Sequence, residues 1–160
     1  MPIYMKYEGI DGEATQAQHK KWIELQSCQL GNSRHVTTVT GAAADREAGV
    51  PQLSEVVVTK EQDGASSKLF EASLIGEGKK VQIDFVSTNN NIYMTVELEN
   101  VLVSSFSVSG SGGQSGGRPM ESLSLNFTKI TYTTFAMDAQ GNRVGNPSRV
   151  AYDIKLADKS

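Results

Sequence analysis

The segment of this sequence that most resembles a binding site is "SGSGGQSGGRP", where five of the eight positions from Gly110 to Gly117 are glycine. Glycine-rich loops bind phosphates when their backbone amides open onto a helix N-terminus. The Gly-x-Gly-x-x-Gly spacing fails here, because the sixth position is Ser115, and no Gly-Lys-Ser/Thr ending follows. The residues downstream alternate like a strand. The sequence therefore predicts a flexible connection between two strands.

The two histidines and the single cysteine do not form a metal-binding or catalytic set. His19 and His35 each lack a Glu or a second His at ligand spacing. Each is predicted to be a surface residue or a hydrogen-bonded structural residue. Cys28 falls in an alternating segment without a neighbouring His or a Cys-x-x-Cys partner. A buried, inert thiol is favoured over a nucleophile.

Two pairs of acidic residues have the composition of an acid–base site but not its setting. Asp45 and Glu47 lie in a long connection, and Glu97 and Glu99 point to the polar side of a strand. Solvated charges are the better interpretation of both pairs. Trp22, beside two lysines, is compatible with a sugar or base platform, but a core or rim aromatic is favoured. The sequence predicts no enzyme, no catalytic residues, no metal site and no cofactor.

The elements that must position these residues are mainly strands, because apolar and polar residues alternate along much of the chain. The clearest unit is a hairpin, in which segments 80–86 and 91–101 flank a run of three asparagines that favours a turn. Further strands are predicted at 2–8, 21–30, 53–60, 101–109, 120–136 and 148–156.

The phase of the alternation predicts where strands bend and which residues share a face. Residues 101–109 are predicted to place Leu102, Phe106 and Val108 on one face. Within 120–136 the apolar phase slips by one residue between Phe127 and Ile130, as a β-bulge would cause where a sheet curls into a barrel. The last segment, 148–156, is predicted to turn four apolar residues to one side: Val150, Tyr152, Ile154 and Leu156.

One segment, 63–78, has helical rather than alternating spacing. It places Leu69 with Ala72, and Phe70 with Leu74, at helical intervals. Asp63, Ser66 and Ser67 are possible caps, and Gly76 or Gly78 a possible stop. About eight strands and one short helix, without a βαβ rhythm, predict a mainly β protein built as a small antiparallel β-barrel, closed or nearly closed.

Length and composition narrow the class of protein further. The 160 residues predict a single domain, 1–160, and the connection 31–51 is predicted to be a functional or contact element. The net charge is −3, and the adjacent lysine pairs are too few for a nucleic-acid footprint. No run approaches the ~20 apolar residues of a membrane span, and the N-terminus lacks the regions of a secretory signal. We expect no nucleic-acid partner and no membrane insertion.

Four blocks of the sequence carry a resemblance to a known family. The main block is "VELENVLVSSFSVSGSGG…ESLSLNFTKITYTT"; the others are "YEGIDGEATQAQHKKWIEL", "VVVTKEQDGASSKLFEASLIGE" and "GNRVGNPSRVAYDIKLADKS". Together they resemble the haemolysin-coregulated protein (Hcp) family, the tail-tube subunit of type VI secretion systems. In the second block the matching residues are Gly9, Gly12, Glu13, His19 and Ile23. Ala14 stands where the family usually has Ser.

The resemblance implies a phage tail-tube-like barrel that assembles as a homohexameric ring with a wide channel. Rings would stack into a tube that a contractile sheath drives out, with a spike protein at its tip. Effector proteins would occupy the channel, so the subunit would also act as a carrier and chaperone. The protein would be cytoplasmic when made and then secreted to the extracellular space or a target cell, without a signal peptide.

The resemblance also suggests which residues face other copies. The helix near 64–76 would face neighbours or the lumen, the connection 31–51 would reach the next ring, and the glycine-rich loop would lie at a ring edge. The candidates for ring stacking are Ser33, Arg34, His35, Val36, Thr37, Thr38, Gly110, Gly112 and Gly113. The lumen or cargo candidates are Ser27 and Gln29.

Two other classes of protein are compatible with a small barrel. The first alternative is a monomeric lipocalin-like β-barrel that binds a small apolar ligand. The strands carry few large aromatic residues, and no long apolar run lines a cup, which disfavours this alternative. The second is a hydrolase, for which the sequence offers no nucleophile–base pair.

Overall fold

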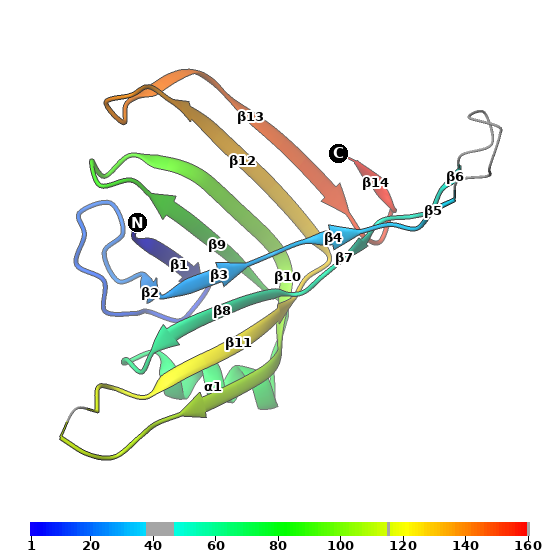
Figure 1. Ribbon diagram of the computed structural model, residues 1–160. Helices are drawn as coiled ribbons and strands as arrows, with labels where there is room; N and C mark the ends of the chain where they lie inside the picture. Colours follow the sequence, from blue (N-terminus) through cyan, green and yellow to red (C-terminus); the bar gives the residue numbers. More distant parts are fainter. Residues whose placement is uncertain (38–46, 115, 160) are drawn as a thin grey trace.

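The computed structural model describes residues 1–37, 47–114 and 116–159 (Figure 1). The predicted mainly β chain with one short helix is confirmed; the helix is α1 (Ser66–Leu74). The strands of the described ranges are β1 (Ile3–Tyr7), β2 (Ile23–Leu25), β3 (Ser27–Gln29), β4 (Asn32–Ser33), β5 (Val36–Thr37), β6 (Glu47–Ala48), β7 (Gln52–Leu53), β8 (Val56–Glu61), β9 (Lys79–Val86), β10 (Ile92–Ser109), β11 (Met120–Asn126), β12 (Lys129–Met137), β13 (Arg143–Asp153) and β14 (Asp158–Lys159).

Antiparallel pairing carries the strands around a closed circuit. β3 pairs with β8, β8 with β11, and β11 with the second half of β10. The first half of β10 pairs with β9, and β1 joins β9 to β2, which runs on into β3. The predicted antiparallel barrel is therefore confirmed. On the other edge of β10, strands β12, β13 and β14 extend one wall beyond the barrel.

β10 is a single strand of 18 residues, which corrects the prediction of two separate strands there. It bends where its register shifts, between Leu98 and Val101 against β9 and between Val103 and Ser105 against β11. β-Bulges of this kind turn a strand from one wall into the next. Asn100, between the two shifts, has a left-handed backbone with φ 55°. The bent strand thus belongs to both walls of the barrel.

The second shift in β10 also separates residues that were predicted to share a face. Leu102 pairs with Asn126 on the outer side and is 44% exposed. Phe106 pairs with the fully buried Leu123 on the core side, and Val108 follows on that same side. The bulge between them inverts the alternation, so the prediction that all three lie on one face is wrong.

The end of the chain follows the prediction in part. The segment predicted as one long strand with a β-bulge, 120–136, is two strands, β11 and β12, and the phase slip falls at the break between them, at residues 127–128. The strand predicted at 148–156 is β13, however, and it spans Arg143–Asp153. The Asp153 carboxylate accepts the backbone N–H groups of Lys155 and Leu156 and thereby forms a turn. Ile154 and Leu156 consequently leave the strand and are exposed.

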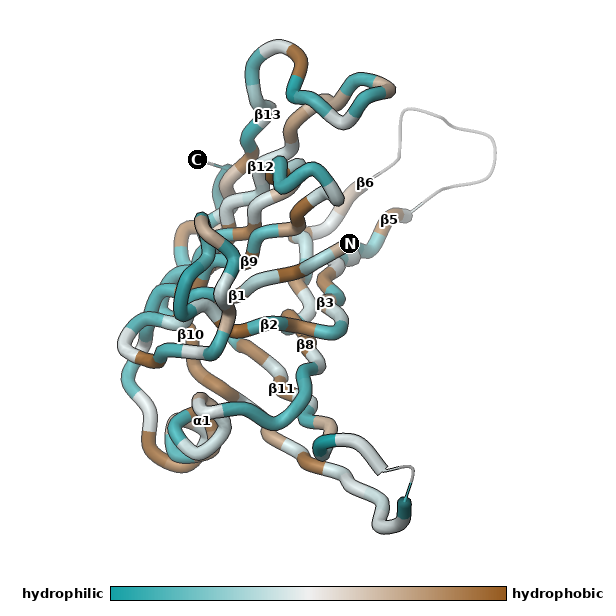
Figure 2. The backbone as a smooth tube through the Cα atoms, turned by 90° about the vertical axis from the view of Figure 1, so that its left-hand side faces the viewer, coloured by the Kyte–Doolittle hydropathy of each residue, from teal (hydrophilic) through white to brown (hydrophobic). Residues whose placement is uncertain are grey.

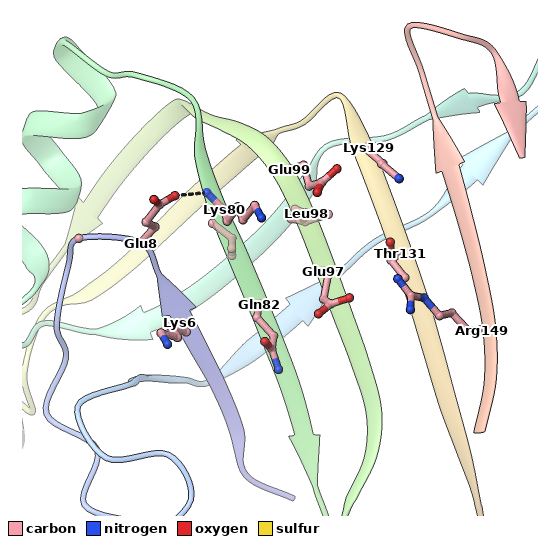
Figure 3. A pocket seen from close by; sticks show the side chains of 12 residues that line it. Lys6, Glu8, Lys80, Gln82, Glu97, Leu98, Glu99, Lys129, Thr131 and Arg149 are labelled. Atoms are coloured by element: carbon pink, nitrogen blue, oxygen red, sulfur yellow. Dashed lines mark hydrogen bonds between the residues drawn. The ribbon is translucent and has the colours of Figure 1, made fainter. Parts of the chain in front are cut away.

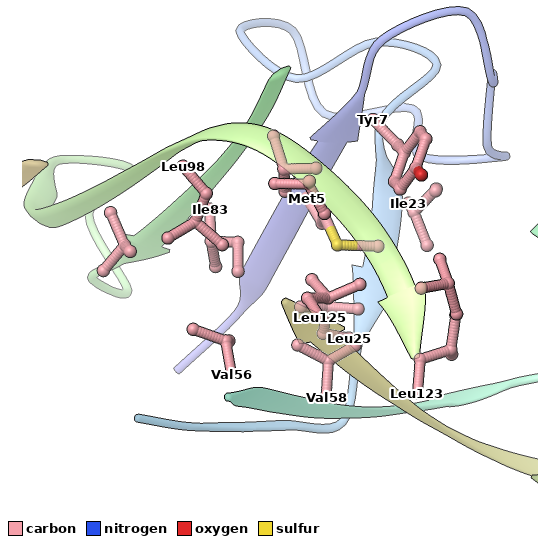
Figure 4. Close-up of a cluster of buried hydrophobic side chains, with 14 of the residues drawn as sticks. Met5, Tyr7, Ile23, Leu25, Val56, Val58, Ile83, Leu98, Leu123 and Leu125 are labelled. Atoms are coloured by element: carbon pink, nitrogen blue, oxygen red, sulfur yellow. The ribbon is translucent and has the colours of Figure 1, made fainter. Parts of the chain in front are cut away.

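Alternating residues from β1, β2, β8, β9, β10 and β11 fill the interior (Figure 4). Met5, Ile23, Ile83 and Leu125 are fully buried, and Leu98 is 1% exposed. They belong to one contiguous cluster, into which α1 inserts Leu69. The side chains occupy the space that a lipocalin-like ligand would need. No helix of the described ranges combines the length and the apolar character needed to cross a membrane.

His19 proves to be a hydrogen-bonded structural histidine. It is buried, with Nε2 2.9 Å from the Asp84 carboxylate and Nδ1 2.5 Å from the Gln16 side-chain oxygen. Its ring stacks on Tyr4 at 4.7 Å and meets the edge of Trp22 at 4.6 Å. These contacts fasten the loop between β1 and β2 to the outer side of the sheet, and they bury Tyr4 where alternation predicts exposure.

Lys60 is the largest polar side chain that is fully buried in the described part of the chain. Its ammonium group donates to Asp63 and Glu121, each at 2.8 Å, and to Ser66 at 3.2 Å. The Asp63 carboxylate also accepts the backbone N–H of Ala65 at the start of α1. The network therefore ties β8, the helix start and β11 together. Asp63 and Ser66 serve this network, whereas the N-cap itself is Ala65.

We expect Lys60→Met to lower the free energy of unfolding by about 3–5 kcal/mol, because it leaves buried carboxylates without their cation. Urea unfolding at a fixed protein concentration measures the change. Lys79→Met is the matched control, since Lys79 is 38% exposed and lies 3.9 Å from Glu77; its effect should stay within about 0.5 kcal/mol.

A double variant, Lys60→Met with Glu121→Met, separates the lost charge pair from lost packing. It removes the more deeply buried of the two carboxylates in this network together with its cation, and it should therefore be less destabilised than Lys60→Met alone. A Lys60→Met protein within about 1 kcal/mol of the parent would contradict this account of the network.

Candidate functional site

The residues that were tested for chemistry do not come together in the structure. Within residues 1–37, 47–114 and 116–159, no three His, Cys, Asp or Glu side chains are arranged to hold a metal ion. Asp45 and the side chain of Glu47 lie outside the described residues. His35 is exposed, whereas His19 is buried. The backbone carbonyl of His35 accepts the N–H of Gly49.

The other acidic pair, Glu97 and Glu99, lies in a polar groove of about 420 Å³ on the outer face of the wall formed by β1, β9, β10, β12 and β13 (Figure 3). Glu97 is exposed and Glu99 half-buried, as expected of solvated charges. Glu99 is the cross-strand partner of Lys129. Cations and anions alternate along this groove; its other charged residues are Lys6, Glu8, Lys80 and Arg149.

Cys28 lies in β3 opposite Val58 and is half-buried, rather than fully buried as predicted. Burial raises the pKa of its thiol to about 11. The group is therefore a neutral thiol at physiological pH, which is the opposite of the lowered pKa that a nucleophilic cysteine needs. The structure agrees with the inert role that the sequence predicts.

The glycine-rich segment connects β10 to β11 at one end of the molecule, as predicted; Ser115 lies outside the described residues. A Cβ atom on Gly112 would meet nothing within 4 Å. Gly113 has φ +124°, a conformation that side-chain-bearing residues rarely adopt. A Cβ on Gly110 would touch only Pro119, at 3.7 Å. The loop is thus a turn that presents backbone to its surroundings.

The described part of the connection 31–51, together with Gln52 and Leu53, forms a two-stranded ribbon. β4 pairs with β7 and β5 with β6, and the ribbon projects away from the barrel (Figure 1). Its exposed side chains include the stacking candidates Ser33, Arg34, His35, Val36 and Thr37. Thr38 lies outside the described residues. Because an isolated two-stranded ribbon is marginally stable, this projection suits a contact with another chain.

The barrel wall has an outer face rich in hydroxyl groups along β3, β8, β11 and the second half of β10. One cross-strand row contains Ser27, Thr59, Ser122 and Ser107. Ser27 and Thr59 share a hydrogen bond between their hydroxyls. Gln29 lies on this same face, and both lumen candidates, Ser27 and Gln29, are exposed. The face is polar, but it is nearly free of the charges that crowd the opposite wall.

The core-facing side of the other wall continues past the barrel onto β12 and β13. The register aligns Val96 of β10 with Tyr132 of β12 and Val150 of β13. Val96 is fully buried, whereas Tyr132 is 38% and Val150 47% exposed. The alternation is thus that of a core strand throughout, although the described part of the chain does not cover its outer end.

An apolar groove of about 460 Å³ lies between this extension and the base of the ribbon. We call it the apolar groove; it is lined by Leu30, Gly31, Asn32, Pro51, Leu53, Ser54, Phe127, Ile130, Tyr132, Val150 and Tyr152. Its floor is the continuation of the core, and its rim is the ribbon.

The helix carries a second exposed apolar surface, which we call the helix patch: Phe70, Leu74 and Ile75. Their exposed fractions are 50%, 67% and 74%. Phe70 and Leu74 are spaced i, i+4 on one side of α1, and Ile75 follows as its C-cap. Phe70 also meets the ring of Phe106 edge-on, with centroids 5.6 Å apart.

Reasoning from residue spacing missed both apolar surfaces, although the resemblance implied that the helix near 64–76 faces neighbours or the lumen. The spacing of Phe70 and Leu74 resembles that of a buried helix face, and the alternation of Val150 and Tyr152 resembles that of any core strand. The only signal in the sequence was an excess of apolar residues in the helical segment. α1 has two apolar stripes, whereas a helix that packs on a barrel buries only one.

Fold and surfaces together define a class of protein: a filled β-barrel without a described catalytic cluster, carrying separate apolar, hydroxyl-rich and projecting surfaces suited to self-association. Comparison with known proteins identifies one family. The sequence profile of the family described as "Type VI secretion system effector, Hcp" matches residues 4–134. The chain belongs to this family, and is thus a protein of type VI secretion systems.

Solved structures agree with the family. A structure described as a type six secretion system protein is 26% identical, covers 99% of each chain and has a TM-score of 0.92. Hcp1 from Salmonella typhimurium is 22% identical over 99% of this chain and 98% of its own, with a TM-score of 0.80. A type VI secretion system effector from Yersinia pestis is 23% identical, covers 94% and 98%, and has a TM-score of 0.69. Comparison with curated protein sequences gives no significant match.

The raised pKa of Cys28 predicts slow alkylation. Below pH 9, a thiol with a pKa of about 11 has about 100-fold less thiolate than one at the ordinary value of 9.0. We expect iodoacetamide to label Cys28 at least that much more slowly than free cysteine at pH 8, with a rate that keeps rising to about pH 11. Mass spectrometry of the alkylated chain measures the rate; a plateau below pH 9 would contradict the assignment.

Proposed function

We propose that this chain is the tube subunit of a type VI secretion system, that it assembles as a homohexameric ring, and that stacked rings form an exported tube. The observation that carries the proposal is the uncovered continuation of the core on β12 and β13, where Tyr132 and Val150 are exposed in the same rows as buried core residues. Family membership supports it, since the family is that of type VI secretion Hcp proteins.

A ring requires a heterologous contact, in which two different surfaces of each subunit meet and the rotation closes. The molecule offers two different apolar surfaces, the apolar groove and the helix patch. Stacking requires a further contact along the tube axis. The exposed ribbon residues from Ser33 to Thr37 and the loop around Gly112 are the candidates for it.

The hydroxyl-rich face is the proposed wall of the channel. Ser and Thr hydroxyls both donate and accept hydrogen bonds, so they can contact proteins of either charge without strong attraction or repulsion. Ser27 and Gln29, exposed on this face, are the proposed cargo-contacting residues. The subunit would thus act as a carrier and chaperone for effector proteins in the channel.

The proposed partners and location follow from this role. The whole chain, 1–160, acts as a single tube domain whose partners are further copies of itself, the spike protein, the contractile sheath and effectors. The protein is made in the cytoplasm and leaves through the type VI system. A net charge of −3 per subunit makes the free ring acidic, which helps to keep it soluble.

Light scattering coupled to size exclusion, followed by negative-stain electron microscopy, tests the proposal. We expect particles of about six times the 17.3 kDa chain mass that appear as open rings. A species that stays at 17.3 kDa at high concentration would contradict the proposal. A monomer with bound lipid would favour the lipocalin-like alternative instead.

The channel assignment predicts that Ser27→Arg leaves rings intact but lowers the delivery of effectors by tenfold or more, because six arginines would crowd and charge the wall. Gln29→Arg should act in the same way. Gln18→Arg is the matched control, because Gln18 is exposed on the loop that covers the opposite wall. Light scattering checks assembly, and immunoblots of co-exported effectors check delivery. Equal delivery by all three variants would refute the channel assignment.

A further inference from the structure

The apolar groove and the helix patch belong to different parts of the fold: the groove lies between β12, β13 and the base of the ribbon, and the patch lies on α1. In both views α1 lies in the lower part of the molecule, near β11 and away from β12 and β13 (Figures 1 and 2). The groove is concave and backed by the core, whereas the patch is a convex row on a helix. Both surfaces are apolar, but their shapes differ, so each complements the other and not itself.

The patch has the residue spacing of a helix that binds in a groove. Such helices anchor themselves through apolar residues at i and i+4, here Phe70 and Leu74. Leu69 points the other way, into the core, and the Lys60 network holds the start of α1 to β8 and β11. The helix is therefore fixed in place, and its exposed side is presented without further ordering, which favours binding.

The apolar groove has exposed apolar side chains that a partner could cover. Its floor includes Ile130, Tyr132 and Val150, which continue the rows of the buried Leu98 and Val96. A core row that is left half exposed is an apolar surface of the kind that marks a protein-binding site. Its rim is the base of the ribbon, in which β4 pairs with β7 and β5 pairs with β6.

We infer that the helix patch of one copy packs into the apolar groove of the next copy, and that this single heterologous contact, repeated, closes the ring. The inference rests on the proposed function and names the two surfaces that would build the ring. Phe70 and Leu74 are the anchors, and Tyr132 and Val150 are the floor that they cover. Each subunit then uses one groove and one patch, so none of either remains exposed in a closed ring.

Two complementary variants test the contact. Phe70→Glu places a charge on the helix patch and leaves the apolar groove unchanged. Val150→Glu places a charge in the apolar groove and leaves the helix patch unchanged. We expect each variant alone to run at 17.3 kDa under conditions where the parent forms rings, with at least a 100-fold weaker association. An equimolar mixture should form heterodimers and nothing larger, because each pair retains one intact contact and has no second one with which to extend.

Controls keep the result specific. Lys68→Glu places a new negative charge on the exposed side of the same helix that faces away from the anchors Phe70 and Leu74, and it should form rings like the parent. Circular dichroism melts of each variant confirm folding. Because Phe70 also contacts Phe106, Leu74→Asp, at a more exposed position, replaces Phe70→Glu if the latter melts early.

The outcomes separate this inference from the proposed function. A parent that forms no rings defeats the proposed function itself. Parent rings that persist in both variants, or variant monomers that do not pair when mixed, overturn the patch-in-groove contact while the tube proposal stands. A small apolar ligand found in the groove of the purified parent by native mass spectrometry would also overturn the contact, because it would occupy the same space.

Discussion

The wall formed by β9, β10, β12 and β13 keeps the alternation of a core strand beyond the point where the barrel closes, so that Tyr132 and Val150 stand in the same row as the fully buried Val96 while remaining 38% and 47% exposed. Burial of apolar surface is the dominant favourable term in both folding and association. A chain that leaves part of its core row uncovered therefore retains a driving force that only another molecule can satisfy. The functions proposed for the other surfaces depend on this uncovered apolar row. Those surfaces are the helix patch on α1, the projecting ribbon and the hydroxyl-rich face.

Presenting such surfaces in a fixed geometry demands a rigid frame, and the most deeply buried polar groups supply it. The Lys60 network joins β8, β11 and the start of α1, so the helix cannot drift from the barrel. On the opposite wall, the His19–Asp84 pair holds a long loop against the sheet between two aromatic rings. β10 connects the walls by passing from one to the other through two register shifts. These buried polar residues serve the frame, whereas the apolar groove, the helix patch and the hydroxyl-rich face are built mainly from apolar and hydroxyl side chains.

Much of the architecture follows from local patterns in the sequence, because alternation and turn residues act over short range. The hairpin around the asparagine run, the phase slip near Phe127 and the single helix could all be predicted. The register between strands that are distant in sequence could not be predicted from local patterns. The bulge after Val103 moves Phe106 to the face opposite Leu102, and the spacing of these residues does not indicate the bulge. The same limit hid the functional surfaces. Phe70 and Val150 have the spacing of core residues, and only the closed barrel shows that no part of the described chain covers them.

Chemical cross-linking of a designed cysteine pair tests the central claim that one copy covers the uncovered core row of the next. In a Cys28→Ser background, cysteines at Phe70 and Val150 in the same chain should be joined between neighbours by a short bis-maleimide. The account predicts a ladder on denaturing gels that rises to six chains and stops there, because the contact is heterologous and the ring closes. Each single-cysteine chain should give no ladder beyond a dimer. Rings that are visible by microscopy but give no ladder with the double-cysteine chain would contradict the account.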